Sequence, residues 1–92
     1  MTLLEIVKYL DTLDDDSTIF ASKPWAIESQ AKAETDLDEK GLSPIAQAEG
    51  LVYFIEVFIA REFLEDWIAG QPTNPSVEGQ CRRLIDYALN DA

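Results

Sequence analysis

The stretch LVYFIEVFIAREFLEDWI, residues 51–68, decides the fold of this chain. Seven of its first nine residues are β-branched or aromatic, which favours a well-buried strand. Because no glycine or proline separates its two halves, the stretch could equally form one long buried helix. We expect a strand to about Ile59, followed by a helix from about Ala60 to Ala69. The inner face of that helix is expected to comprise Phe63, Leu64, Trp67 and Ile68.

Glu56 is a charged residue within this hydrophobic stretch. In a strand it shares a face with Phe54 and Phe58, because side chains alternate between the two sides. One arrangement is an edge strand that the charge protects from further pairing. A second is a buried ion pair with a cation such as Arg61 or Lys32. The third is a carboxylate that faces a ligand.

On the N-terminal side, the sequence predicts an amphipathic helix that begins after Thr2. Thr2 and Glu5 have the spacing of a capping box. The run Asp14-Asp15-Asp16-Ser17 ends the helical pattern, because short acidic side chains favour turns over helix interiors. The apolar stripe of this helix comprises Leu3, Ile6, Val7, Leu10 and Leu13.

Two short strands are expected next, at Thr18–Ser22 and around Ser29–Thr35. The second strand has the weaker signal, because alanines and Lys32 replace the usual β-branched residues. The two are expected to form a hairpin whose connection contains Trp25.

Beyond this hairpin, the polar residues 36–43 predict a loop. Pro44–Glu49 is expected to form a short helical turn capped by Ser43. After a break rich in glycine and proline, Asn74 is expected to cap a last helix with Pro75 at its first position. The apolar face of that helix comprises Val77, Cys81, Leu84, Ile85, Ala88 and Leu89.

The order of these elements is helix, strand, strand, short helix, strand, helix, helix. It predicts an α+β fold with a small antiparallel three-stranded sheet covered by helices. A length of 92 residues is that of a single compact domain, residues 1–92.

Several segments carry a resemblance to known proteins. The leucine-rich first helix, the Thr18–Ala21 strand, the GLVYFI segment and the final PSVE helix ending in Asn-Asp-Ala resemble small acidic bacterial α+β domains of unknown function. The resemblance spans most of the chain and rests mostly on packing residues. It therefore implies this order of elements and no activity.

The charge balance limits the classes of partner that the protein is expected to bind. Eighteen Asp and Glu against seven Lys and Arg give a formal net charge of −11. This charge disfavours direct binding to nucleic acid or to an anionic membrane, because both are polyanions. It favours fast association with a basic protein partner.

The N-terminal residues lack the basic and apolar regions of a signal peptide. The single cysteine, Cys81, gives no indication of an oxidising compartment. Charged residues interrupt the longest apolar stretch, so no ordinary transmembrane helix is expected. We expect a cytoplasmic protein.

Residues 36–47 have part of the pattern of a calcium-binding loop. Asp36 and Asp38 occupy the first and third ligand positions, ahead of a glycine at the sixth. Lys40 places a cation at the fifth position, and Gln47 at the twelfth lacks the bidentate carboxylate. With no histidine and one cysteine, a zinc site has no plausible ligand set. We predict no metal site and no cofactor.

No catalytic residue is predicted either. Cys81 has no histidine to activate it, and its place on an apolar helix face is that of a core residue. Glu62 and Asp66 are neighbours on one helix, but an acid–base pair needs environments that separate the two pKa values. The simplest expectation is that both carboxylates face water. We therefore expect that the protein is not an enzyme.

The acidic composition favours a small protein-binding module. An inhibitor, an immunity protein, an antitoxin or a phage-encoded inhibitor of a nucleic-acid-handling machine fits, since carboxylates on a rigid domain can occupy a basic cleft built for phosphates. Trp25 is either an exposed aromatic anchor or folds back on the core. The expected partner contacts are Asp14, Asp15, Asp16, Trp25, Asp36, Asp38 and Glu39.

The alternative is an accessory or structural subunit without an inhibitory role. Such a subunit assembles through apolar surface, and its contacts are expected at Tyr53, Phe58 and Trp67. The composition leaves the oligomeric state open.

Overall fold

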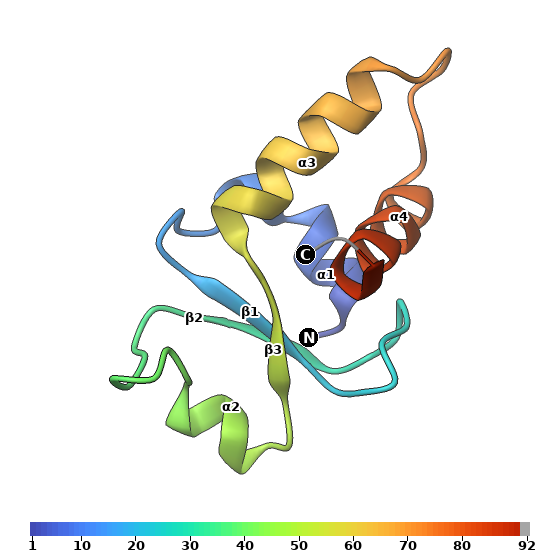
Figure 1. Ribbon diagram of the computed structural model, residues 1–92. Coiled ribbons are helices and arrows are strands. Elements are labelled where there is room, and N and C mark those ends of the chain that lie inside the picture. Colours follow the sequence, from blue (N-terminus) through green and yellow to red (C-terminus); the bar gives the residue numbers. More distant parts are fainter. Residues whose placement is uncertain (91–92) are drawn as a thin grey trace.

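One antiparallel sheet, with strand order β2-β1-β3, organises the computed structural model, which describes residues 1–90 (Figure 1). Its strands are β1 (Thr18–Ala21), β2 (Ala31–Glu34) and β3 (Val52–Glu56). The helices of the described residues are α1 (Leu3–Lys8), α2 (Pro44–Ala48), α3 (Val57–Ala69) and α4 (Val77–Asn90), with a 3₁₀ turn at Leu10–Thr12. The predicted α+β fold, its three-stranded antiparallel sheet and its order of elements are confirmed.

The sheet has two unlike faces, because successive residues of β1 point in opposite directions. Ile19 lies in the main core, together with buried residues of α1, α3 and α4. Its neighbour Phe20 packs with Ala46 and Leu51 in a smaller cluster beside α2. We call these two sides the helix face and the α2 face.

The boundary between β3 and α3 differs from the prediction. The strand ends at Glu56 and the helix begins at Val57, so the predicted strand to about Ile59 is too long. Val57, Ala60 and Leu64 are buried at helical spacing. Packing of this stripe outweighs the β propensity of the aromatic and β-branched residues around it.

The predicted N-cap is confirmed for α1 and is wrong for α4. In α1 the capping box is confirmed: the Thr2 hydroxyl accepts the Glu5 N–H (3.2 Å) and the Glu5 carboxylate accepts the Thr2 N–H (2.9 Å). The hydrogen bonds from Thr2 lower the pKa of the Glu5 carboxyl. The prediction of a cap at Asn74 is wrong, because α4 begins only at Val77. The Ser76 hydroxyl accepts the N–H three residues further on, at 3.0 Å, as an N-cap does.

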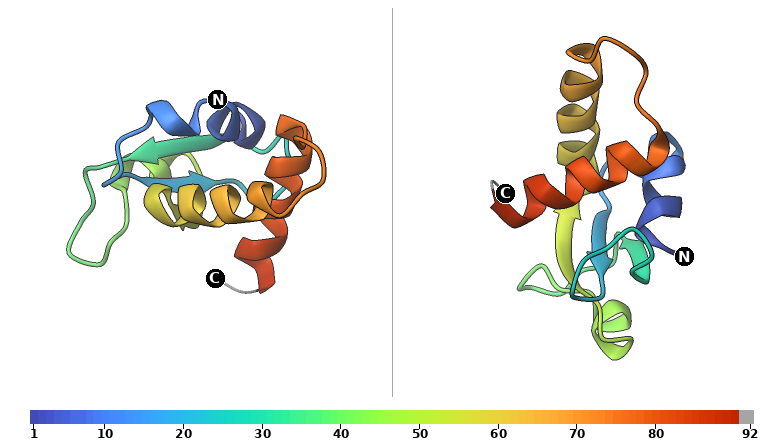
Figure 2. Two further views of the ribbon diagram at one scale, coloured as in Figure 1. Left: turned by 90° about the horizontal axis from the view of Figure 1, so that it is seen from above. Right: turned by 90° about the vertical axis from the view of Figure 1, so that its right-hand side faces the viewer.

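α3 continues the direction of β3 beyond the sheet (Figure 2), so the described chain is elongated, at 41 by 24 by 23 Å. One side of α3 packs toward α4, where the rings of Phe63 and Tyr87 stack with centroids 4.1 Å apart. Of the predicted inner face, Leu64 is buried, whereas Phe63, Trp67 and Ile68 are only half-buried against the core. The opposite side of α3 faces solvent along its length.

Candidate partner-binding surface

The two acidic loops predicted as partner contacts leave the sheet at the same end. Thr18 at the start of β1 pairs with Glu34 at the end of β2. The segment before β1 contains Asp14, Asp15 and Asp16, and the segment after β2 contains Asp36, Asp38 and Glu39; all are exposed. The antiparallel pairing therefore brings together two acidic runs that are about twenty residues apart in the sequence.

The aspartate turn before β1 is ordered by its own hydrogen bonds. The Asp14 carboxylate accepts the N–H of Asp16 (3.0 Å), and the Asp14 carbonyl accepts the Ser17 N–H (3.0 Å) and hydroxyl (2.6 Å). The Ser17 carbonyl in turn accepts the Val57 N–H at the start of α3 (3.0 Å). These bonds hold the turn against α3.

Arg61, one turn further along α3, also binds the aspartate turn and the segment that precedes it. Its guanidinium donates to the carbonyl of Leu10 through two nitrogens (3.1 and 2.8 Å) and also to the carbonyl of Leu13. A third nitrogen forms an ion pair with the Asp15 carboxylate. Of the alternatives for Glu56, the ion pair with Arg61 or Lys32 is not formed: Arg61 binds Asp15, and Lys32 binds Glu49 (2.8 Å). Glu56 instead ends β3, which is an edge strand of the sheet as the first alternative has it.

One carboxylate of the loop after β2 forms hydrogen bonds within that loop. The Asp38 carboxylate accepts the N–H groups of Lys40 (2.9 Å) and Leu42 (3.0 Å). Gly41 has a positive φ of 76°, which a residue without a side chain adopts readily. Asp38 therefore shapes the turn, while Asp36 and Glu39 present their carboxylates to solvent.

The outer face of α3 adds carboxylates that the sequence interpretation had assigned only to solvation. Glu62, Glu65 and Asp66 are exposed on this face. Phe58 lies one turn before Glu62 and is 47% exposed, so this face carries an aromatic ring beside its carboxylates. The spacing of residues 58, 62 and 65 is helical and was visible in the sequence. What the sequence did not reveal is that this face adjoins the aspartate turn.

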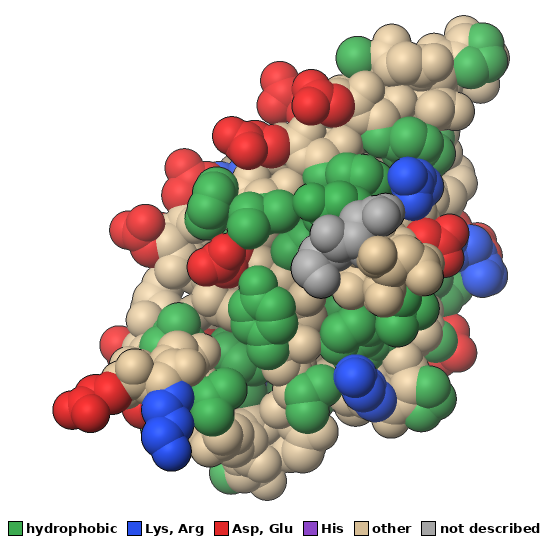
Figure 3. All heavy atoms as spheres, viewed as in Figure 1, with side chains coloured by type: hydrophobic (Ala, Val, Ile, Leu, Met, Phe, Trp, Pro, Cys, Tyr) green, Lys and Arg blue, Asp and Glu red, His purple; other side chains and the backbone are tan. Residues whose placement is uncertain are grey.

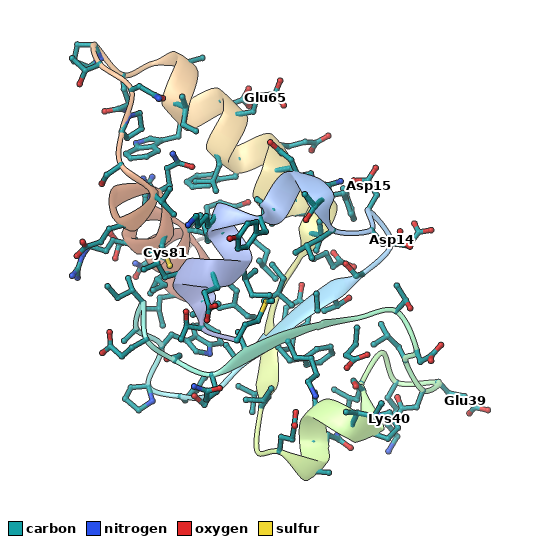
Figure 4. The ribbon with its side chains drawn as sticks, turned by 180° about the vertical axis from the view of Figure 1, so that it is seen from behind. Asp14, Asp15, Glu39, Lys40, Glu65 and Cys81 are labelled. Carbon is teal, nitrogen blue, oxygen red and sulfur yellow. The ribbon has the colours of Figure 1, made fainter. Side chains whose placement is uncertain are left out.

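We call the combined surface the acidic edge. Figure 3 shows acidic side chains gathered along α3 and down the same side of the molecule. From behind, Figure 4 places Glu65, Asp14 and Asp15 along one side, with Glu39 and Lys40 at the tip of the loop below them. The acidic edge comprises Asp14, Asp15, Asp16, Glu56, Glu62, Glu65 and Asp66, extended by Asp36 and Glu39.

Trp25 lies elsewhere, at the opposite end of the β1–β2 hairpin. Its ring meets Phe54 edge to face, with centroids 4.8 Å apart, and its indole N–H donates to the Ala21 carbonyl (3.3 Å). Of the two alternatives, the tryptophan folds back on the core and is half-buried. The Lys23 ammonium lies 4.8 Å from the ring centroid, and the surface hollow beside the ring is lined by charges of both signs, from Arg82, Glu28 and Asp86. The structure does not unite Trp25 with the acidic loops.

Two exposed aromatic residues, Tyr53 and Phe58, lie near the acidic edge. Tyr53 of β3 is 45% exposed and packs edge to face on Phe20. Burial, followed by the charge of Glu56, raises the pKa of the Tyr53 hydroxyl. Of the three aromatic contacts predicted for an assembling subunit, Tyr53 and Phe58 are exposed, whereas Trp67 packs against the core.

Cys81 is 1% exposed in the core, and burial raises the pKa of its thiol to about 11. Because the thiolate is the reactive form, an aromatic disulfide reagent is expected to label the native protein far more slowly than the urea-unfolded chain at pH 8. The raised pKa also means that the Cys81 thiol ionises from about pH 8.5 in the unfolded chain, whereas in the folded chain it stays protonated up to about pH 11. The free energy of unfolding should therefore fall over that range. Equal labelling rates in the two states would contradict the buried position.

Within residues 1–90, no three or more Cys, Asp or Glu side chains gather in a way that could hold a metal ion. None of the helices in this part of the chain has both the length and the hydrophobicity needed to cross a lipid bilayer. Comparisons with protein-family models, with curated proteins and with solved structures found no match. The resemblance to small acidic bacterial domains therefore stays a prediction.

Proposed function

We propose that this protein is an acidic protein-binding module that engages the basic cleft of a partner, in the manner of an inhibitor, immunity protein or antitoxin. The observation that carries the proposal is the acidic edge, where the aspartate turn is joined to α3 through Arg61 and the outer face of α3 carries both exposed carboxylates and the exposed Phe58. Aromatic residues are enriched at the energetic centres of interfaces. Phe58 takes the place of Trp25 as the aromatic anchor.

A cleft that handles nucleic acid is the class of partner that suits this surface best. Such a cleft presents lysine and arginine side chains to a row of phosphates. On α3, Glu62 and Asp66 are one turn apart, about 6 Å along the axis, and the helix holds them in place. Carboxylates held in this way can occupy phosphate positions without a large loss of conformational entropy.

The internal cation of the edge strengthens this proposal. Arg61 is directed inward, to the carbonyls of Leu10 and Leu13 and to Asp15. Its charge therefore stabilises the turn and is directed away from an incoming partner. Asp14, Glu62 and Glu65 keep their negative charge at the surface, where it steers a basic partner toward the edge.

Charge reversal tests the proposal. The chain is used to capture proteins from a lysate of its native host, and the affinity of each retained protein is measured at low and high salt. The double variant Glu62→Lys/Glu65→Lys is expected to bind the partner at least about tenfold more weakly than the parent chain. Affinity should also fall steeply with salt, because the charges are exposed.

The matched control changes the same charge on the other side of the molecule. In Glu28→Lys/Asp86→Lys, both positions are exposed and border the hollow beside Trp25. We expect this variant to lose less than about threefold in affinity. Salt-independent binding, or equal losses in the two variants, would refute the acidic edge as the contact surface.

The second candidate is an accessory subunit that assembles through apolar surface. It is favoured by the exposure of Val52, Tyr53 and Phe58, at 43%, 45% and 47%. Sedimentation over a wide range of concentrations separates the two candidates. A mass that rises with concentration supports self-assembly, and a constant monomer mass counts against it.

A further inference from the structure

The outer edge of β3 differs from that of β2. The N-terminal segment covers the beginning of the β2 edge, where Thr2 forms a bridge with Gln30 and the Ala31 N–H donates to the Met1 carbonyl (2.7 Å). β3 is the last strand on the other side of the sheet, and none of the described residues pairs with its outer side. An edge strand presents unpaired backbone N–H and C=O groups that can bind another extended chain.

The register shows which side chains a fourth strand would meet on the α2 face. Glu34, Thr18 and Glu56 form one row across the sheet. Lys32, Phe20 and Tyr53 form the next row. A strand added beside β3 therefore places one of its side chains next to the Glu56 carboxylate and another next to the exposed Tyr53 ring.

The charge at this edge disfavours a second copy of the chain. Pairing of two β3 strands would bring together two chains of net charge −11 each, and such like-charged partners repel each other. A bulge at Phe54, which has no counterpart on β1, limits the length of regular pairing for any added strand. The edge therefore suits a short segment of opposite charge.

We infer that the partner inserts an extended basic segment as a fourth strand along Val52–Glu56, with a lysine or arginine beside Glu56 and an apolar side chain on Tyr53. This inference rests on the proposed function and specifies how the partner is held. Backbone hydrogen bonds supply affinity, and the two side-chain positions supply specificity. The acidic edge that begins at Glu56 then attracts the basic residues that follow in the partner.

A model peptide tests the inference on the full chain. The probe is a short acetylated and amidated peptide in which lysine alternates with valine or threonine. The control peptide has the same sequence but carries N-methyl groups on alternate residues, so it keeps its charge and loses the donors for strand pairing. Binding is followed at about 20 mM salt, where screening is weak, by the backbone amide shifts of isotope-labelled protein.

We expect the unmethylated peptide to bind at least about fivefold more tightly than the methylated one. The largest amide shifts should lie in residues 52–56. Glu56→Lys should weaken binding about fivefold or more, and Glu56→Gln should weaken it less, whereas the matched Asp86→Lys change on α4 should have less than about a twofold effect. Circular dichroism checks that each variant is folded.

Two outcomes would overturn strand addition. Equal binding of the two peptides, with shifts confined to residues 14–16 and 58–66, would overturn it and leave the acidic edge as the binding surface. Absence of binding by either peptide would overturn it as well. The proposed function is decided separately, by the charge-reversal variants measured with the captured partner.

Discussion

A Phe54→Ala variant is expected to lose about 3–5 kcal/mol of the free energy of unfolding. Phe54 is 2% exposed and belongs to the main core. Its ring also supports Trp25, so truncation leaves a cavity beneath the tryptophan. Because a small domain is stable by only about 5–15 kcal/mol, this single change should remove a large part of the stability. Urea unfolding, followed by circular dichroism and tryptophan fluorescence, measures the loss.

Phe58→Ala is the matched control. The same residue type is removed four positions later, from a side chain that is 47% exposed, and the expected loss is under about 1 kcal/mol. The pair also checks the strand-to-helix boundary. If the strand continued to Ile59, Phe54 and Phe58 would share one face and their losses would be similar. Similar losses would therefore contradict the helix start at Val57.

An Arg61→Met variant is expected to lower the free energy of unfolding by about 2–3 kcal/mol. The change removes the donors to the carbonyls of Leu10 and Leu13 and the ion pair with Asp15. Methionine keeps the aliphatic part of the side chain, so the loss reports the polar contacts. Urea unfolding gives the magnitude, and hydrogen exchange of residues 10–17 should rise as the aspartate turn is released.

Arg82→Met provides the comparison for this change. Arg82 pairs with Glu78 one turn away (2.7 Å), and both side chains are well exposed. Surface pairs of this kind contribute little, so the expected loss is under about 1 kcal/mol. Equal losses at Arg61 and Arg82 would show that the contacts of Arg61 with the turn do not stabilise the fold.

Local sequence rules predicted most of the elements. The capping box of Thr2 and Glu5, the short helix after Ser43 and the order of elements along the chain follow from patterns within a few residues. The start of α3 could not be predicted in this way. Residues 57–59 have strand propensity, and only the burial of Val57 with Ala60 and Leu64 makes them helical.

The candidate site was harder to predict, for two different physical reasons. The separation of Trp25 from the acidic loops follows from hairpin topology, because the connection of a hairpin lies at the opposite end from its two outer flanks. That step was available from the sequence. The meeting of the aspartate turn with α3 was not, since it depends on the Ser17–Val57 hydrogen bond and on Arg61, contacts between segments more than 35 residues apart.

The attachment of the aspartate turn to α3 makes recognition conditional on folding. A partner that contacts Asp14 and Glu62 together recognises an arrangement of carboxylates that exists only while Arg61 holds the aspartate turn against α3. Neither segment alone, as an excised peptide, reproduces that pattern. By linkage, a partner that binds only the folded chain raises the free energy of unfolding of this chain. The complex thus protects the very arrangement that it recognises.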